Sequence, residues 1–123
     1  MPGFPGGDTL IIVTKTPTGA HDSMGVAVTE DTFVPVYGCV LEPLERGPVE
    51  EMSDTTTSSE RAWAFFPYIE GVTTVISNAN WIRPLRPDPM GRRDYKVQGR
   101  LEIEYDLDGQ PDHVWVTCEF KAG

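Results

Sequence analysis

The chain has 123 residues with 10 basic and 19 acidic side chains, and its formal net charge is −9. That balance argues against a general basic footprint for DNA, and no apolar run approaches the roughly 20 residues that span a membrane. Leu, Ile, Val and Phe supply 29 residues, enough for the core of one modest domain. Gly and Pro, 23 in all, are spread without a repeat, which excludes collagen and a helical bundle.

The apolar composition favours strands over helices. Val and Ile together number 18 and Thr 12, against 6 Leu. β-branched side chains lose rotamer freedom in a helix and pack well on a pleated sheet. Short runs separated by turn signals about every ten residues are typical of a small barrel or sandwich. We therefore predict an all-β fold, a small antiparallel β-barrel or sandwich over residues 8–121.

The first third begins with a Pro/Gly-rich stretch, residues 1–7, which we expect to be a flexible extension. The expected elements then follow in chain order: a strand at 9–14, a loop at 15–25, and strands at 26–30 and 33–44.

The middle of the chain contains a segment that suits no ordinary hairpin connection. Residues 45–60 carry acidic, Thr and Ser side chains with almost nothing to bury. Loops of this length are uncommon in compact domains and are usually functional or disordered. Strands are expected after it at 61–66, 72–76 and 81–85, with a turn at Ser77-Asn78.

The last third has the clearest pattern. Val97, Leu101, Ile103 and Tyr105 fall on one face of a strand, and an Asp-Gly turn follows at 106–110. The returning strand alternates in the same way, and its inward side chains are Val114, Val116, Cys118 and Phe120. This predicts a C-terminal hairpin with one buried face. Trp115 points away from that face, so we expect it against another layer or a neighbouring subunit.

Reactive groups lack the settings that catalysis requires. His21-Asp22 has no second ligand set, Ser58-Ser59 has no nucleophile elbow, and Glu102 and Glu104 suit a solvated strand face. We therefore expect no enzymatic activity, no catalytic or metal-binding residues and no cofactor. Cys39 and Cys118 are expected to be reduced, small core side chains.

The charges are unevenly distributed along the chain. Residues 81–100 carry six bases against Asp88 and Asp94, whereas residues 101–119 carry six acids and no Lys or Arg. Two interpretations remain open, a mixed solvated surface or a head-to-tail oligomer in which opposite patches meet. The candidate subunit-interface residues are Arg92, Arg93, Lys96, Arg100, Glu102, Glu104 and Trp115.

Several motifs, taken in order, resemble the head-to-tail stopper (head-closure) proteins of long-tailed bacteriophages, those of actinobacterial phages in particular. The motifs are Gly38-Cys39-Val40-Leu41-Glu42-Pro43 before the long loop, Trp63-Ala64-Phe65-Phe66-Pro67, Trp81-Ile82-Arg83-Pro84, and Asp94-Tyr95-Lys96-Val97-Gln98-Gly99 before the hairpin. The resemblance spans residues 8–121.

The resemblance implies a barrel assembled as a ring, often of twelve copies, in the virion neck. The ring would lie between the adaptor ring under the portal and the tail terminator. It would retain the packaged double-stranded DNA that passes through its lumen without specific binding, and would attach the tail. Assembly would take place in the host cytoplasm, with no membrane partner.

The family's gating loop corresponds here to residues 45–60. The candidate lumen residues are Glu45, Glu50, Glu51, Asp54, Thr55, Thr56, Thr57, Ser58 and Ser59. Two alternatives remain, a tail terminator or minor tail subunit, and a monomeric barrel that binds a small ligand.

Overall fold

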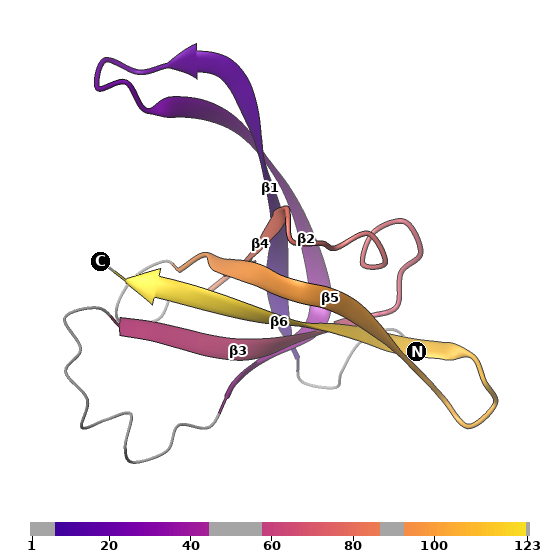
Figure 1. Ribbon diagram of the computed structural model, residues 1–123. Helices are drawn as coiled ribbons and strands as arrows, with labels where there is room; N and C mark the ends of the chain where they lie inside the picture. Colours follow the sequence, from indigo (N-terminus) through magenta and orange to yellow (C-terminus); the bar gives the residue numbers. More distant parts are fainter. Residues whose placement is uncertain (1–6, 45–57, 87–92, 123) are drawn as a thin grey trace.

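The computed structural model describes residues 7–44, 58–86 and 93–122, which form six antiparallel strands (Figure 1). In chain order the strands are β1 (Asp8–His21), β2 (Ala27–Pro43), β3 (Ser58–Pro67), β4 (Asn80–Pro84), β5 (Tyr95–Tyr105) and β6 (Pro111–Ala122). They close into one barrel in the order β1-β2-β3-β6-β5-β4. The all-β prediction is confirmed, and the barrel is uneven because its strands differ greatly in length.

Every second residue of the barrel strands points inward, and these side chains fill the barrel interior. On β3 the inward residues are Ala62, Ala64 and Phe66, all fully buried. The adjacent β6 contributes Val114, Val116 and Cys118. Each large apolar side chain removed from water contributes about 1.5–3 kcal/mol. Closure also leaves each barrel strand with two neighbours, which protects its edges.

The first two strands extend well beyond the barrel as a two-stranded arm, defined here as residues 16–30. In Figure 1 this arm is the indigo and purple hairpin that rises away from the other strands. β1 pairs with β4 only from Leu10 to Thr14, but with β2 as far as His21. Every residue of the arm is exposed.

The predicted loop at 15–25 is therefore wrong for residues 15–21, which belong to β1, whereas residues 22–25 form the turn of the arm. The predicted break between strands 26–30 and 33–44 is also wrong. β1 continues to His21 although it contains Pro17. Pro17 lies beyond the last residue of β1 that pairs with β4, so its missing N–H breaks no hydrogen bond to β4. Gly19, with a positive φ of 87°, lies in a bulge between the Pro17 and His21 pairs. β2 is continuous because Asp31 and Thr32 still pair with β1.

The predicted strand at 72–76 is also wrong, since these residues form turns. The fully buried Thr73 hydroxyl donates to the Pro67 carbonyl at 2.9 Å and accepts from the Ile69 N–H at 2.8 Å. Such side-chain bonds compete with a sheet ladder. The segment still contributes to the core, because Ile76 is buried and Val72 packs against the core.

The C-terminal hairpin is confirmed. The Asp106 N–H donates to the Gln110 carbonyl at 2.8 Å, and Gly109 adopts a φ of 80° in the turn. Leu101 and Ile103 pack against the core as predicted. Tyr105 does not, since it is exposed near the hairpin tip, which projects from the barrel (Figure 1).

Candidate functional site

The long segment between β2 and β3 is held at both of its described ends. The Leu44 N–H donates to the Arg61 carbonyl at 2.9 Å, which continues the β2–β3 pairing by one bond. On the other side, β3 begins at Ser58, and Ser58 and Ser59 pair with Ala122 and Lys121 of β6. The barrel therefore fixes the chain on both sides of residues 45–57.

The predicted lumen residues divide into two groups. Ser58 and Ser59 belong to β3, so the prediction that they form part of a loop is wrong: their backbones already pair with β6. The others lie outside the described residues, namely Glu45, Glu50, Glu51, Asp54, Thr55, Thr56 and Thr57.

Glu60, the last residue of the predicted loop, binds two side chains, Arg93 just before β5 and Tyr95 at its first position. Its carboxylate accepts hydrogen bonds from Arg93 and, at 2.7 Å, from the Tyr95 hydroxyl. Burial raises the pKa of Tyr95 to about 12, and the neighbouring Glu60 carboxylate adds to the shift. The Arg93 guanidinium also lies 5.1 Å from the centre of the Phe120 ring. Glu60 thus ties the start of β3 to β5.

Most of the predicted basic interface residues have partners within the chain. Arg93 binds Glu60, and the exposed Arg100 lies 3.8 Å from Glu102. Lys96 places its ammonium 3.7 Å from the centre of the Trp81 ring. Arg92 lies outside the described residues. The described part of residues 81–100 therefore forms a less concentrated positive patch than the sequence indicates.

An acidic aromatic surface, defined as Trp63, Phe65, Trp115, Glu102 and Glu104, covers the outer face of β3, β6 and β5. Phe65 lies 6.5 Å from Trp63 and 6.4 Å from Trp115 between ring centres. The Trp115 indole N–H donates to Glu104 at 3.0 Å.

The sheet register places these residues side by side, since Phe65 pairs with Trp115 and Trp115 with Glu102. At the edge of this surface His113 stacks on Phe65 and contacts Asp112 at 2.9 Å. The outward orientation predicted for Trp115 is confirmed.

A basic outer cluster, defined as Lys15, Phe33, Trp81, Arg83, Asp94 and Lys96, lies on the outside of β1, β2, β4 and the start of β5. Val13 sits between Phe33 and Trp81 in the register and is fully buried, yet it does not belong to the barrel core. The ammonium of Lys15 lies 4.5 Å from the Trp81 ring centre, and Arg83 lies 5.1 Å from that of Phe33.

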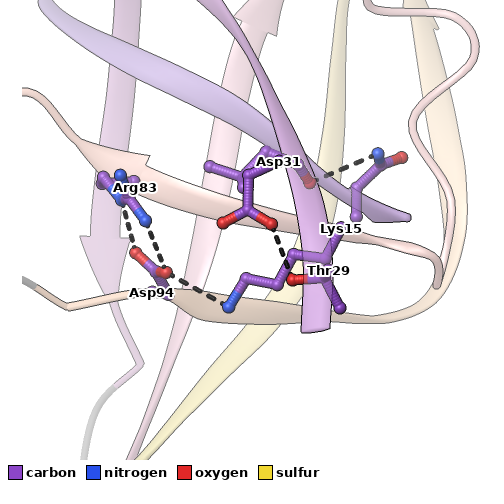
Figure 2. Close-up of polar contacts among 7 residues, drawn as sticks. Lys15, Thr29, Asp31, Arg83 and Asp94 are labelled. Atoms are coloured by element: carbon purple, nitrogen blue, oxygen red, sulfur yellow. Dashed lines mark hydrogen bonds and ion pairs between the residues drawn. The ribbon is translucent and has the colours of Figure 1, made fainter. Parts of the chain in front are cut away.

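Asp94 organises the charges of this cluster (Figure 2). It accepts two hydrogen bonds from Arg83, at 2.6 and 2.8 Å, and lies 3.5 Å from the Lys15 ammonium. The Arg83 hydrogen bonds, together with the two positive charges, hold the pKa of Asp94 below its usual value. Asp31 adds a second carboxylate nearby and accepts a 3.0 Å bond from the Thr29 hydroxyl.

The described part of the chain contains no group of His, Cys, Asp or Glu that could hold a metal ion. Both cysteines are free and buried, as predicted. Burial raises the pKa of each thiol to about 12, so neither forms a nucleophilic thiolate near neutral pH.

The hollows on the described surface include two open ones. One of about 260 Å³ lies beside Asp8, Leu41 and Arg86. The other, of about 340 Å³, lies between Val34 and Val75 at the base of the arm. Neither contains a cluster of reactive groups.

No family model, curated protein or solved structure matches this chain. Within the described ranges, no helix is long and apolar enough to cross a membrane. Function must therefore be inferred from the residues and their geometry.

Sequence reasoning missed the basic outer cluster, because Lys15 was assigned to a loop and β1 pairs with β4 across some 70 residues. Trp63 and Phe65 could have been found, since they alternate with the inward Ala62, Ala64 and Phe66.

Proposed function

We propose that this protein is a structural subunit of a bacteriophage neck, a head-to-tail stopper that closes the filled head and provides the surface to which the tail attaches. The observation that carries the proposal is a closed barrel that fixes a long inserted segment at both ends, between Leu44 and Ser58. This is the architecture that the resemblance implies.

The positions of the resembling motifs support the proposal. Gly38–Pro43 ends β2 immediately before the inserted segment, and Trp63–Pro67 ends β3. Trp81–Pro84 forms most of β4, and Asp94–Gly99 leads into β5 of the hairpin. The motifs thus lie on two adjoining pairs of strands, β2–β3 and β5–β4, rather than on one local element.

The charge of the molecule suits a channel through which DNA moves without adhering. The net charge is −9, and Arg83, Arg86, Arg93 and Arg100 each bind a carboxylate of the same chain. A surface of this kind has little capacity to release counterions from phosphates, which is the main source of nonspecific DNA affinity. Duplex DNA could therefore slide past it.

The small-ligand alternative has less support. A ligand-binding barrel needs an interior cavity lined by a few convergent polar groups. Here the interior is filled by Phe66, Ile82, Val97, Val114 and Val116, all at 1% exposure or less.

The proposal is tested by removing the protein from an assembling phage with an early stop codon. We expect DNA-packaged heads that lose their DNA and fail to join tails, with both defects restored by the wild-type chain supplied in trans. A tail terminator would behave differently, because its loss leaves the heads sealed and it copurifies with tails. That result would contradict the stopper assignment.

A further inference from the structure

We infer that the acidic aromatic surface of one copy binds the basic outer cluster of a second copy, and that repetition of this contact builds a head-to-tail oligomer. The inference rests on the proposed function for its biological purpose, since it names the surfaces through which the subunits of a neck ring would meet. Its geometric support is independent of the phage assignment.

The acidic aromatic surface has the composition of a protein interface. Trp and Phe are enriched in interface centres, where carboxylates at the edge set the partner's charge. Trp63, Phe65 and Trp115 lie on the outside of the barrel, away from the core cluster. The hydrogen bond from Trp115 to Glu104 fixes the indole and the carboxylate relative to one another before any partner arrives.

The charge of this surface selects its occupant. Glu102 and Glu104 lie beside the aromatic rings, and the exposed Asp112 lies at their edge. Arg100, 3.8 Å from Glu102, offsets only part of this negative charge. Packing the surface against its own copy in a twofold dimer would bring like charges together, which costs several kcal/mol. The partner must therefore be positively charged and partly aromatic.

The basic outer cluster of the same chain meets both conditions. Lys15, Arg83 and Lys96 surround Trp81 and Phe33, with Asp94 and Asp31 as the neighbouring carboxylates. Phe33 is 50% exposed, so apolar area is available between the cations.

The two surfaces share β5, on which Lys96 lies near the first residue and Glu104 near the last, and their other residues lie on different strands. In the ring β1-β2-β3-β6-β5-β4, the β3–β6 pair lies directly opposite the β4–β1 pair. Complementary patches at two separate places on one molecule make a heterologous contact when each patch binds a different neighbour. Repetition of that contact closes a ring or extends a filament, and cannot stop at a twofold dimer.

The test uses the full chain and two single-surface variants in sedimentation velocity at low ionic strength. The wild type should associate beyond a dimer as its concentration rises. Lys96→Glu and Glu104→Lys should each weaken association about tenfold or more, because each places like charges in the contact. Lys96→Gln, which removes the charge without reversing it, should weaken it less. Glu70→Lys, at an exposed acid in a turn that belongs to neither surface, is the control and should associate like the wild type.

Mixing the two variants gives the decisive result. Each variant retains one intact surface, and the two altered surfaces carry opposite charges, so the mixture should recover association to at least a one-to-one dimer. A mixture that stays monomeric, a wild type that stays monomeric or stops at a dimer, or variants that associate like the wild type would each overturn the inference. A chain that is found in virion necks but fails this test refutes the interface alone, whereas one that passes but is absent from necks refutes the phage function alone.

Discussion

Strands β1 and β2 run through two regions of opposite character, the barrel and the arm. In the barrel, Leu10, Ile12 and Val36 are buried in the core. In the arm the same strands keep their pairing but bury nothing, and Met24 at the tip is 84% exposed. Backbone pairing alone therefore holds the arm together, whereas backbone pairing and core packing together stabilise the barrel.

The turn of the arm explains how it forms without a core. The Asp22 carboxylate accepts hydrogen bonds from the backbone N–H groups of Met24 and Val26, at 2.8 and 3.0 Å. Gly25 supplies the left-handed conformation, with a φ of 82°. Since an isolated two-stranded hairpin is marginally stable in water, we expect the arm to open far more readily than the barrel.

The largest difference should appear on truncation of matched side chains. Phe66→Ala should lower the free energy of unfolding by about 3–5 kcal/mol, and Leu10→Ala by about 2–5, because each leaves a cavity in the core. Val28→Ala in the arm should change it by no more than about 0.5 kcal/mol. Urea denaturation followed by tryptophan fluorescence measures all three. A loss at Val28 equal to that at Leu10 would show that the arm shares the core's stability.

Alkaline pH should act on the barrel alone. Cys39, Cys118 and Tyr95 have pKa values raised to about 12, so the native state holds protons that the unfolded chain releases sooner. Their contribution to the free energy of unfolding is complete below the pKa of the same group in the unfolded chain, about 8.5 for a thiol and about 10 for Tyr. It is lost as pH rises toward 12.

Stability should thus fall by about 1.4 kcal/mol per pH unit for each group once its unfolded form has ionised. Denaturation at intervals from pH 7 to pH 11 measures this fall. Cys118→Ala removes one of the three groups, so the free energy of unfolding should fall less steeply with pH in that variant. An unchanged slope in that variant would remove Cys118 from the account.

Deleting the arm should have a smaller effect. Lys15 and Asp31 are paired, so an Asn-Gly turn between them can replace residues 16–30 and close the shortened hairpin. We expect the free energy of unfolding to change by less than about 1 kcal/mol, since no buried side chain is removed. Differential scanning calorimetry measures it. Failure of the shortened chain to fold would mean that the arm and barrel form one cooperative unit.

The smallest effect should come from Asp94, which lies where the barrel meets the arm. Its lowered pKa stabilises the fold above the unfolded value of about 3.9, and this contribution is lost as pH falls through the folded pKa. Asp94→Asn should lower stability at pH 7 by at most about 1 kcal/mol, because the pair is near the surface. In acid denaturation the stability difference between the variant and the wild type should be smaller at pH 2 than at pH 7. An equal difference at both pH values would contradict the linkage.

The sequence predicted those parts of the fold in which alternation and burial coincide. Val97, Ile103, Val114 and Val116 marked the hairpin because each inward residue is apolar and, except for Trp115, its neighbours are polar. The arm was missed because Pro17, Gly19 and Gly25 resemble loop signals, although Gly19 serves a bulge and Gly25 a turn.

The candidate surfaces could be predicted only in part. The outward orientation of Trp115 follows from alternation. The pairing of Arg83 with Asp94 and of Arg93 with Glu60 depends on how the barrel closes, which the local pattern does not specify. For that reason the basic segment has fewer unneutralised charges in the structure than its sequence indicates.

The central claim is that this barrel forms the ring between head and tail, and an electron cryo-microscopy map of the intact virion neck tests it most directly. We predict a ring of these barrels directly below the adaptor, with Leu44 and Ser58 facing the central channel and the acidic aromatic surface of each copy against the basic outer cluster of the next. A neck without this chain, or a ring in which Leu44 and Ser58 face outward, would contradict the account.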